Sequence, residues 1–321
     1  MLARKCARAH YYRYTLRITR RRPFRKPLIG IILHEMIDAW IKAQTIDDYN
    51  NDPWKVLEFH EKKYADLFQE EREKYGDIPQ LTSQIFEGYM RRWKDDGITY
   101  VGAELPIKTN LTDDIELVGK LDAIVMMPSG LRFLLERKFM TKLATAEDRF
   151  SDIQTLLYFW AWNREHRKEE QLDGVIWDYG RMKPPTVPEV LKSGELTRRK
   201  DIDTDAYTYL EAIKDNGLKP GDYVEQLNML KGKETTFFER VPLPAPPKKM
   251  VETVVEDARI TAIMRKQMGD IAPRDGMSMF NCKTCEFRSV CEAEVRGHDW
   301  EFVTKRDYKP REERDASGDE E

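Results

Sequence analysis

Three residues in the middle of this sequence have the types and spacing of a hydrolytic site. Asp122 lies in GKLDAIV, and Glu136 and Lys138 lie in LLERKF. Residues two apart on a strand project from the same face, so Glu136 and Lys138 lie side by side, and a hairpin can place Asp122 next to them. Because burying charge at the end of an apolar strand is costly, the trio suggests a function.

The chemistry that suits two carboxylates and a lysine is phosphodiester hydrolysis. The carboxylates of Asp122 and Glu136 can hold a hard divalent cation, Mg²⁺ or Mn²⁺. Such a cation lowers the pKa of a bound water, while Lys138 orients that water or stabilises the transition state. The alternative is a salt-bridged strand end, since the pattern D…ExK often occurs by chance.

Three more side chains could complete this site. Gln154 and Tyr158 are four residues apart on the predicted helix after the Glu136 strand, hence on one face, where they could position a phosphate or a base. His34 lies on an apolar helical stripe and could be a third metal ligand. The alternatives are a coincidental surface pair and a core histidine.

The cysteines form a second candidate site. Cys282, Cys285 and Cys291 lie in CKTCEFRSVC, and the one other cysteine of the chain, Cys6, is near its start. Three thiolates are one short of a four-thiolate site, so Cys6 is the candidate fourth ligand and would tie the two ends of the chain together. The spacing leaves zinc, an iron–sulfur cluster and four unrelated buried thiols open.

The N-terminal segment is strongly basic, although the net charge of the whole chain is only −3. No acidic residue precedes Glu35. We predict a phosphate-binding surface there; a cleavable transit peptide and a solvated charged face are the alternatives. The residues expected to contact nucleic acid are Arg20, Arg21, Arg22, Arg25 and Lys26.

Periodicity predicts the elements that position these residues. Helices are expected at about 27–45, 52–75, 80–96, 144–168, 203–215, 221–231 and 247–268. Strands are expected at 97–107, 115–127 and 131–139, as a meander, and then at 173–180 and 235–243. The order predicts a single α/β domain over residues 1–300, with a central mixed sheet flanked by helices, and a polar, acidic, disordered tail over residues 301–321.

Several classes of protein are disfavoured. No Walker-type or G-x-G-x-x-G motif supports a motor or a dinucleotide-binding protein. No apolar stretch approaches the roughly 20 residues of a membrane span. No secretory leader is visible, so we expect a cytoplasmic protein with reduced thiols.

Taken in order, these motifs resemble those of a known family. His34 in ILHEMI, Asp122 in GKLDAI, Glu136-x-Lys138 in LLERK and Gln154-x-x-x-Tyr158 in DIQTLLY are similar to the motifs of RecB-like PD-(D/E)XK nucleases. The cysteine layout resembles that of their iron–sulfur branch, which includes AddB-type nuclease domains, CRISPR-adaptation exonucleases and stand-alone phage proteins. The resemblance covers residues 6–291.

The resemblance implies a restriction-endonuclease-like core with a helical N-terminal part and a C-terminal iron–sulfur loop. The metal ligands for Mg²⁺ or Mn²⁺ would be His34, Asp122 and Glu136. Lys138 would be the catalytic lysine, and Gln154 and Tyr158 would position the substrate. The resemblance also favours a 4Fe–4S cluster over zinc, held by Cys6, Cys282, Cys285 and Cys291.

The expected activity is metal-dependent exonucleolytic cleavage of DNA in recombination or DNA processing. The expected partners are DNA that is single-stranded or has free ends, and a helicase or recombination protein; the location would be the host cytoplasm if a phage encodes the protein. The alternatives are a non-catalytic DNA-binding or recombination-accessory subunit and a redox sensor. Arg137 departs from the family, which has an apolar residue there, and suggests a more polar sheet edge.

Overall fold

The computed structural model describes residues 5–45, 51–63, 65, 76–141, 152–231 and 237–311. Its α-helices are α2 (Ala7–His10), α3 (Arg25–Thr45), α4 (Pro53–Lys63), α7 (Ile78–Trp93), α9 (Ile153–Glu165), α10 (Ala206–Asp215), α11 (Val224–Lys231), α12 (Lys248–Met268), α13 (Met279–Lys283), α14 (Arg288–Val295) and α15 (Trp300–Asp307). Its strands are β1 (Ile18–Arg20), β2 (Thr99–Thr112), β3 (Ile115–Met126), β4 (Arg132–Met140), β5 (Gly174–Arg181), β6 (Phe238–Pro244) and β7 (Tyr308–Pro310). Short π- and 3-10-helical turns are η1 (Tyr11–Thr15), η2 (Lys168–Glu170), η3 (Pro220–Tyr223) and η4 (Gly269–Ile271).

The central sheet has five strands in the order β2-β3-β4-β5-β6. Strands β4 and β5 are parallel, and the other neighbouring strands are antiparallel. Two parallel neighbours need a crossover, and helix α9 provides it. The predicted α/β class with a mixed central sheet is confirmed.

The predicted meander is also confirmed, because β2, β3 and β4 are consecutive antiparallel neighbours. Strand β2 extends through Thr112, so the first turn is shorter than the predicted NLTDD segment. Residues 66–75 of the helix predicted after residue 52 lie outside the described residues. The same holds for residues 144–151, so the described helix α9 begins at Ile153.

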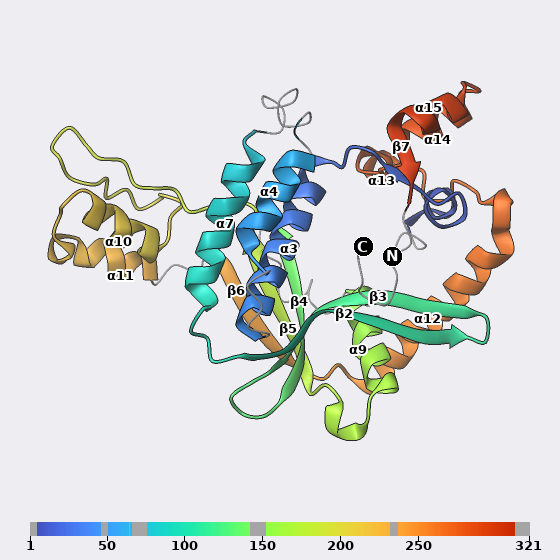
Figure 1. Ribbon diagram of the computed structural model, residues 1–321, viewed down its shortest axis with the longest axis horizontal. Coiled ribbons are helices and arrows are strands. Elements are labelled where there is room, and N and C mark those ends of the chain that lie inside the picture. Colours follow the sequence, from blue (N-terminus) through green and yellow to red (C-terminus); the bar gives the residue numbers. More distant parts are fainter. Residues whose placement is uncertain are drawn as a thin grey trace.

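Helices cover both faces of the sheet (Figure 1). On one face, α3, α4 and α7 bury a cluster that includes Ile32, Met36 and Phe86 together with Phe139 of β4. On the other face, α9 and α12 pack on the residues of β4 and β5 that point the opposite way. Burial of these two apolar layers drives the fold, and β4 lies in the middle of both.

Arg137 corrects one expectation. The prediction of a polar sheet edge is wrong, because β4 is the third of five strands and Arg137 is only 1 % exposed. Its guanidinium is paired with Asp178 on the neighbouring strand β5, with Nε 3.3 Å from Oδ2. A buried arginine is tolerated here because a carboxylate in the facing register position neutralises it.

The C-terminal boundary is a second correction. Residues 300–310 form α15 and β7, and β7 pairs with β1 as a two-stranded antiparallel sheet. Tyr308 is 1 % exposed and stacks on Phe287, with ring centroids 6.0 Å apart. A tail beginning at residue 301 is therefore wrong, because these aromatic side chains anchor the segment. Residues 312–321 lie outside the described residues.

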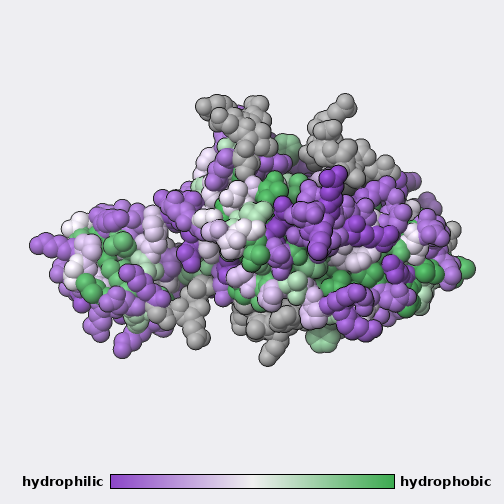
Figure 2. Space-filling view, turned by 90° about the horizontal axis from the view of Figure 1, so that it is seen from below, coloured by the Kyte–Doolittle hydropathy of each residue, from purple (hydrophilic) through white to green (hydrophobic). Residues whose placement is uncertain are grey.

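A lobe between β5 and β6 stands apart from the rest of the molecule (Figures 1 and 2). It contains α10 and α11 and buries its own cluster, which includes Tyr209, Ile213 and Tyr223. An ion pair between Arg181 and Asp203, 2.9 Å long, links its first loop to the end of β5. The single domain over residues 1–300 remains a prediction. None of the described helices is long and apolar enough to cross a membrane.

Candidate active site

Strand register places three carboxylates in a row across β2, β3 and β4. The register of β2 with β3 sets Glu104 across from Asp122. The register of β3 with β4, extended by one residue, sets Glu136 across from Asp122 on its other side. Like charges that face each other on adjacent strands are destabilising, so this row needs positive charge beside it.

His34 reaches the row from helix α3. Its Nδ1 lies 3.3 Å from Asp122 Oδ1, while Asp122 Oδ2 accepts a hydrogen bond from the backbone N–H of Arg137 at 2.7 Å. Burial opposes ionisation of Asp122, but the charges of His34 and Arg137 hold its pKa below the ordinary value. One ligand atom from each of His34, Asp122 and Glu104 falls within 4.8 Å of the others, a grouping that suits a metal ion.

Glu104 was missed in the sequence. It is the only acidic residue of the strand predicted over residues 97–107, and that was its one visible signal. Its backbone φ is 52°, in the left-handed region that residues with a side chain rarely adopt. Its Oε2 lies 2.9 Å from Lys120 Nζ. Strained backbone of this kind is concentrated at functional sites, and here it coincides with the carboxylate row.

Glu136 and Lys138 form a close pair on the same face of β4. Lys138 Nζ donates to Glu136 Oε1 at 2.5 Å and lies 3.5 Å from Asp152 Oδ2. Burial, and then the charge of Asp122, raises the pKa of Glu136 to about 7. Burial works against the charge of Lys138, but Glu136 and Asp152 raise its pKa above the ordinary value, so the lysine stays cationic.

The second oxygen of Glu136 tests whether a metal fits this site. Glu136 Oε2 is buried and has no hydrogen-bond partner among the described residues. An ionised carboxylate oxygen in that state is costly unless a cation faces it. Carboxylate oxygens with one imidazole suit Mg²⁺ or Mn²⁺ better than a soft metal. His34 and Asp122 lie together as predicted, with Glu104 added; Glu136 as a ligand stays a prediction.

One comparison with known proteins decides the family. A model of the PD-(D/E)XK nuclease superfamily matches residues 2–292. The chain belongs to that superfamily. Among curated proteins, none matches the chain. The carboxylate row and Lys138 lie well inside the matched region.

The other residues predicted for this site, Gln154 and Tyr158, lie on α9. Asp152 caps the helix by accepting from the Gln154 backbone N–H at 3.2 Å. Tyr158 packs directly on Gly119 of β3, where an added Cβ would lie 2.4 Å from its ring. Burial, and then the charge of Glu136, raises the pKa of Tyr158, which places its phenol near the row. Substrate positioning by Gln154 and Tyr158 remains a prediction.

The structure also brings the two ends of the chain together around the cysteines. Cys6 precedes α2, and a Cβ on Gly276 would lie 2.8 Å from Cys6 Cβ, so only glycine permits this approach. Burial raises the pKa of the Cys285 thiol, and the charges of the other cysteines raise it further. The Ala7 backbone N–H donates to Asp275 at 2.6 Å, which fastens the N-terminal segment beside the triplet.

The basic residues predicted to contact nucleic acid lie at different places in the structure. Arg21 lines a groove beside β1 and β7. Arg20 packs over Phe24, with its guanidinium carbon 4.5 Å from the ring centroid. Lys26 donates to Thr141 Oγ1 at 3.2 Å, next to the end of β4. Their contacts with nucleic acid, and those of Arg22 and Arg25, stay predictions.

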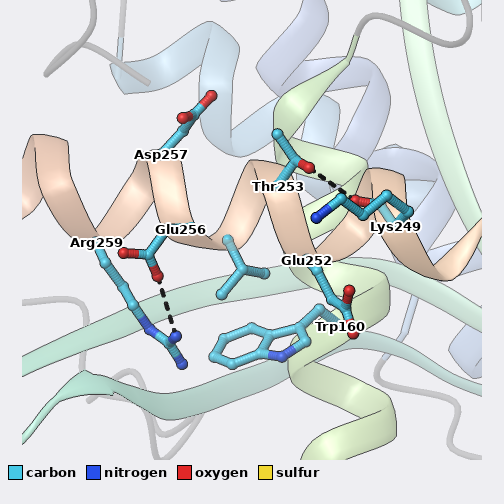
Figure 3. Close-up of a pocket in the computed structure, with 8 residues that line it drawn as sticks. Trp160, Lys249, Glu252, Thr253, Glu256, Asp257 and Arg259 are labelled. Atoms are coloured by element: carbon cyan, nitrogen blue, oxygen red, sulfur yellow. Dashed lines mark hydrogen bonds and ion pairs between the residues drawn. The ribbon is translucent and has the colours of Figure 1, made fainter.

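A second groove, between α9 and α12, lies away from the row (Figure 3). Trp160 forms its floor, and an ion pair of 3.4 Å joins Arg259 to Glu256 on its wall. None of the row residues lines it. Glu252, Glu256 and Asp257 outnumber Lys249 and Arg259 in its lining, so the groove lacks the positive charge that attracts a phosphate chain.

Proposed function

We propose that this protein is a divalent-metal-dependent deoxyribonuclease that removes nucleotides from DNA ends in recombination or DNA processing. The observation that carries the proposal is the buried Oε2 of Glu136, which has no hydrogen-bond partner within the described ranges and lies in a row of carboxylates beside a cationic lysine. Membership in the PD-(D/E)XK nuclease superfamily supports the same chemistry.

The residues have separate roles. The metal would be held by His34, Glu104, Asp122 and Glu136, and it would supply an acidified water and charge neutralisation at the phosphate. Lys138, kept cationic by its carboxylate neighbours, orients the attacking water and stabilises the charge of the transition state. Gln154 and Tyr158 align the substrate strand from α9.

End-labelled DNA tests this proposal. Purified wild-type protein should shorten single- or double-stranded DNA from its ends when Mn²⁺ is present and not when it is chelated. The variant Lys138→Met should lose activity by about 10²–10³-fold and keep its fold. The matched control Lys108→Met, in an exposed pair with Glu116 away from the row, should retain most activity. Equal activity of Lys138→Met and wild type would contradict the proposal.

We further propose that the protein belongs to the RecB-like iron–sulfur branch, with a 4Fe–4S cluster on Cys6, Cys282, Cys285 and Cys291. The support for this ligand set is that the four cysteines are brought near one another: besides burial, Cys6, Cys291 and Cys282 all raise the pKa of the Cys285 thiol. The choice of iron–sulfur over zinc follows the resemblance of the cysteine layout to that branch.

Metal analysis tests the cluster. Protein purified without oxygen should be brown and contain iron and sulfide, and Cys6→Ser should lose the colour as fully as Cys285→Ser. Stability should fall with the cluster, because its binding energy contributes to folding. One zinc and no iron would reject the cluster, and full colour in Cys6→Ser would reject the fourth ligand.

A further inference from the structure

The two ends of the described chain form a groove of about 620 Å³ on the sheet of β1 and β7. Apart from five basic residues, the side chains that line it are apolar or carry a hydroxyl. No acidic side chain lines it among the described residues. This is a concentrated positive charge on a chain whose net charge is −3. The basic residues that line it are Arg17, Arg21, Lys305, Lys309 and Arg311.

Pairing between the ends of the chain builds this groove. Strand β1 pairs with β7, and the Arg311 backbone N–H donates to the Arg17 carbonyl at 2.7 Å. Arg17 has a φ of 53°, in the left-handed region, a conformation that is strained for a residue with a side chain. The surrounding pairing maintains this strain, and strained backbone of this kind is a mark of binding sites.

The groove is close to the carboxylate row along the chain. Arg21 precedes α3 by four residues, and His34 is nine residues into that helix, about 14 Å along its axis. Lys26 contacts Thr141 at the end of β4, so the start of α3 adjoins the strand of Glu136. With at most about 14 Å for the connecting residues, the groove lies within about 30 Å of His34.

We propose that this basic groove binds the sugar–phosphate backbone of the nucleic-acid substrate, away from the bond that is cleaved. The proposal rests on the proposed nuclease function, because it assigns a second contact to the same substrate. Lysine and arginine contacts with phosphates supply affinity without sequence preference. At about 3.4 Å per nucleotide, a strand that reaches both places spans on the order of ten nucleotides.

Binding without cleavage tests the groove. A labelled 30-nucleotide DNA is titrated with the protein in EDTA at several salt concentrations. The double variant Lys309→Gln with Arg311→Gln should bind more weakly, and its salt slope should fall by about 0.7–0.9 for each lost phosphate contact. The matched control is Lys192→Gln with Lys200→Gln, two exposed lysines on the lobe. Should the groove pair unsettle β7, Lys305→Gln on α15 gives the same test with one contact.

The outcomes separate the groove from the nuclease activity. A groove variant with the affinity and salt slope of the wild type would overturn the proposal, whatever the protein cleaves. Cleavage of a dinucleotide, too short to reach the groove, should be unchanged in the groove variant, while cleavage of subsaturating 30-mer should fall. Wild-type protein that cleaves neither substrate would reject the nuclease activity and leave the binding result intact.

Discussion

Strand β4 carries buried charged residues on both faces, and the charges on the two faces are balanced to different extents. On one face, Arg137 is matched by Asp178, whose two oxygens accept hydrogen bonds from Tyr89, Arg137 and Arg240. On the other face, Glu136 keeps one buried oxygen that has no hydrogen-bond partner in the described part of the chain. Both carboxylates are almost fully buried, at 0 % and 2 % exposure.

The comparison separates stability from function. Asp178 lies among cations and hydroxyl donors that balance its charge, so its face is structural. Glu136 faces Asp122, a like charge, and its pKa is raised to about 7 by burial and by that neighbour. A protein tolerates such an arrangement where a bound cation or substrate completes it. Arg137 connects the faces, because its backbone N–H donates to Asp122 at 2.7 Å.

The largest expected effect is on the balanced face. Asp178→Asn removes the ion-pair partner of the buried Arg137 and one of the two carboxylates that pair with Arg240, which keeps Asp96. The free energy of unfolding should therefore fall by about 3–5 kcal/mol. The matched control is Asp201→Asn, in an exposed pair with Arg199, which should leave the free energy of unfolding nearly unchanged. Urea unfolding of both variants measures the difference. Small and equal losses of unfolding free energy in the two variants would contradict the structural role of the Asp178 face.

On the face of Glu136, a substitution should reduce activity and leave stability intact. Glu136→Gln should reduce cleavage by about 10²–10³-fold, because it removes an ionised group that acts at the reacting phosphate. The free energy of unfolding of the metal-free variant at pH 8 should be no lower than that of the wild type, since a costly buried charge has gone. A loss of stability as large as that of Asp178→Asn would contradict the assignment.

A smaller effect should appear in the pH dependence of stability. Glu136 titrates near pH 7 in the folded protein and near its ordinary value of 4.5 when unfolded. The folded state therefore holds more protons between these values, and metal-free stability should fall as pH rises through them, by at most about 1.4 kcal/mol per pH unit. Glu136→Gln should remove this slope. The same slope in both proteins would show that another group causes it.

The sequence predicted most of the fold because its strands and helices have clear periodicity. Asp122, Glu136 and Lys138 could be found because their positions on successive strands imply one shared face. Glu104 could not, since its place depends on the register of β2 with β3 and on a left-handed backbone conformation. Neither feature is encoded by local spacing.

Long-range partners explain the two corrections. Arg137 was expected at a polar edge. That expectation failed because the partner of Arg137, Asp178, lies on a distant strand that only the parallel pairing with β4 brings near. The segment after residue 300 was expected to be disordered from its charge. Trp300 and Tyr308, which pack on the N-terminal helices and the cysteine segment, outweigh that charge.

Calorimetric titration with Mn²⁺ tests the central claim, that the carboxylate row is a metal site. At pH 6, where Glu136 is largely protonated, the wild type should bind Mn²⁺ and release at least one proton, counted by repeating the titration in buffers of different ionisation enthalpy. Asp122→Asn should lose binding, and Glu104→Gln should weaken it by about tenfold or more. Binding that releases no proton and is unchanged by Asp122→Asn would contradict the claim.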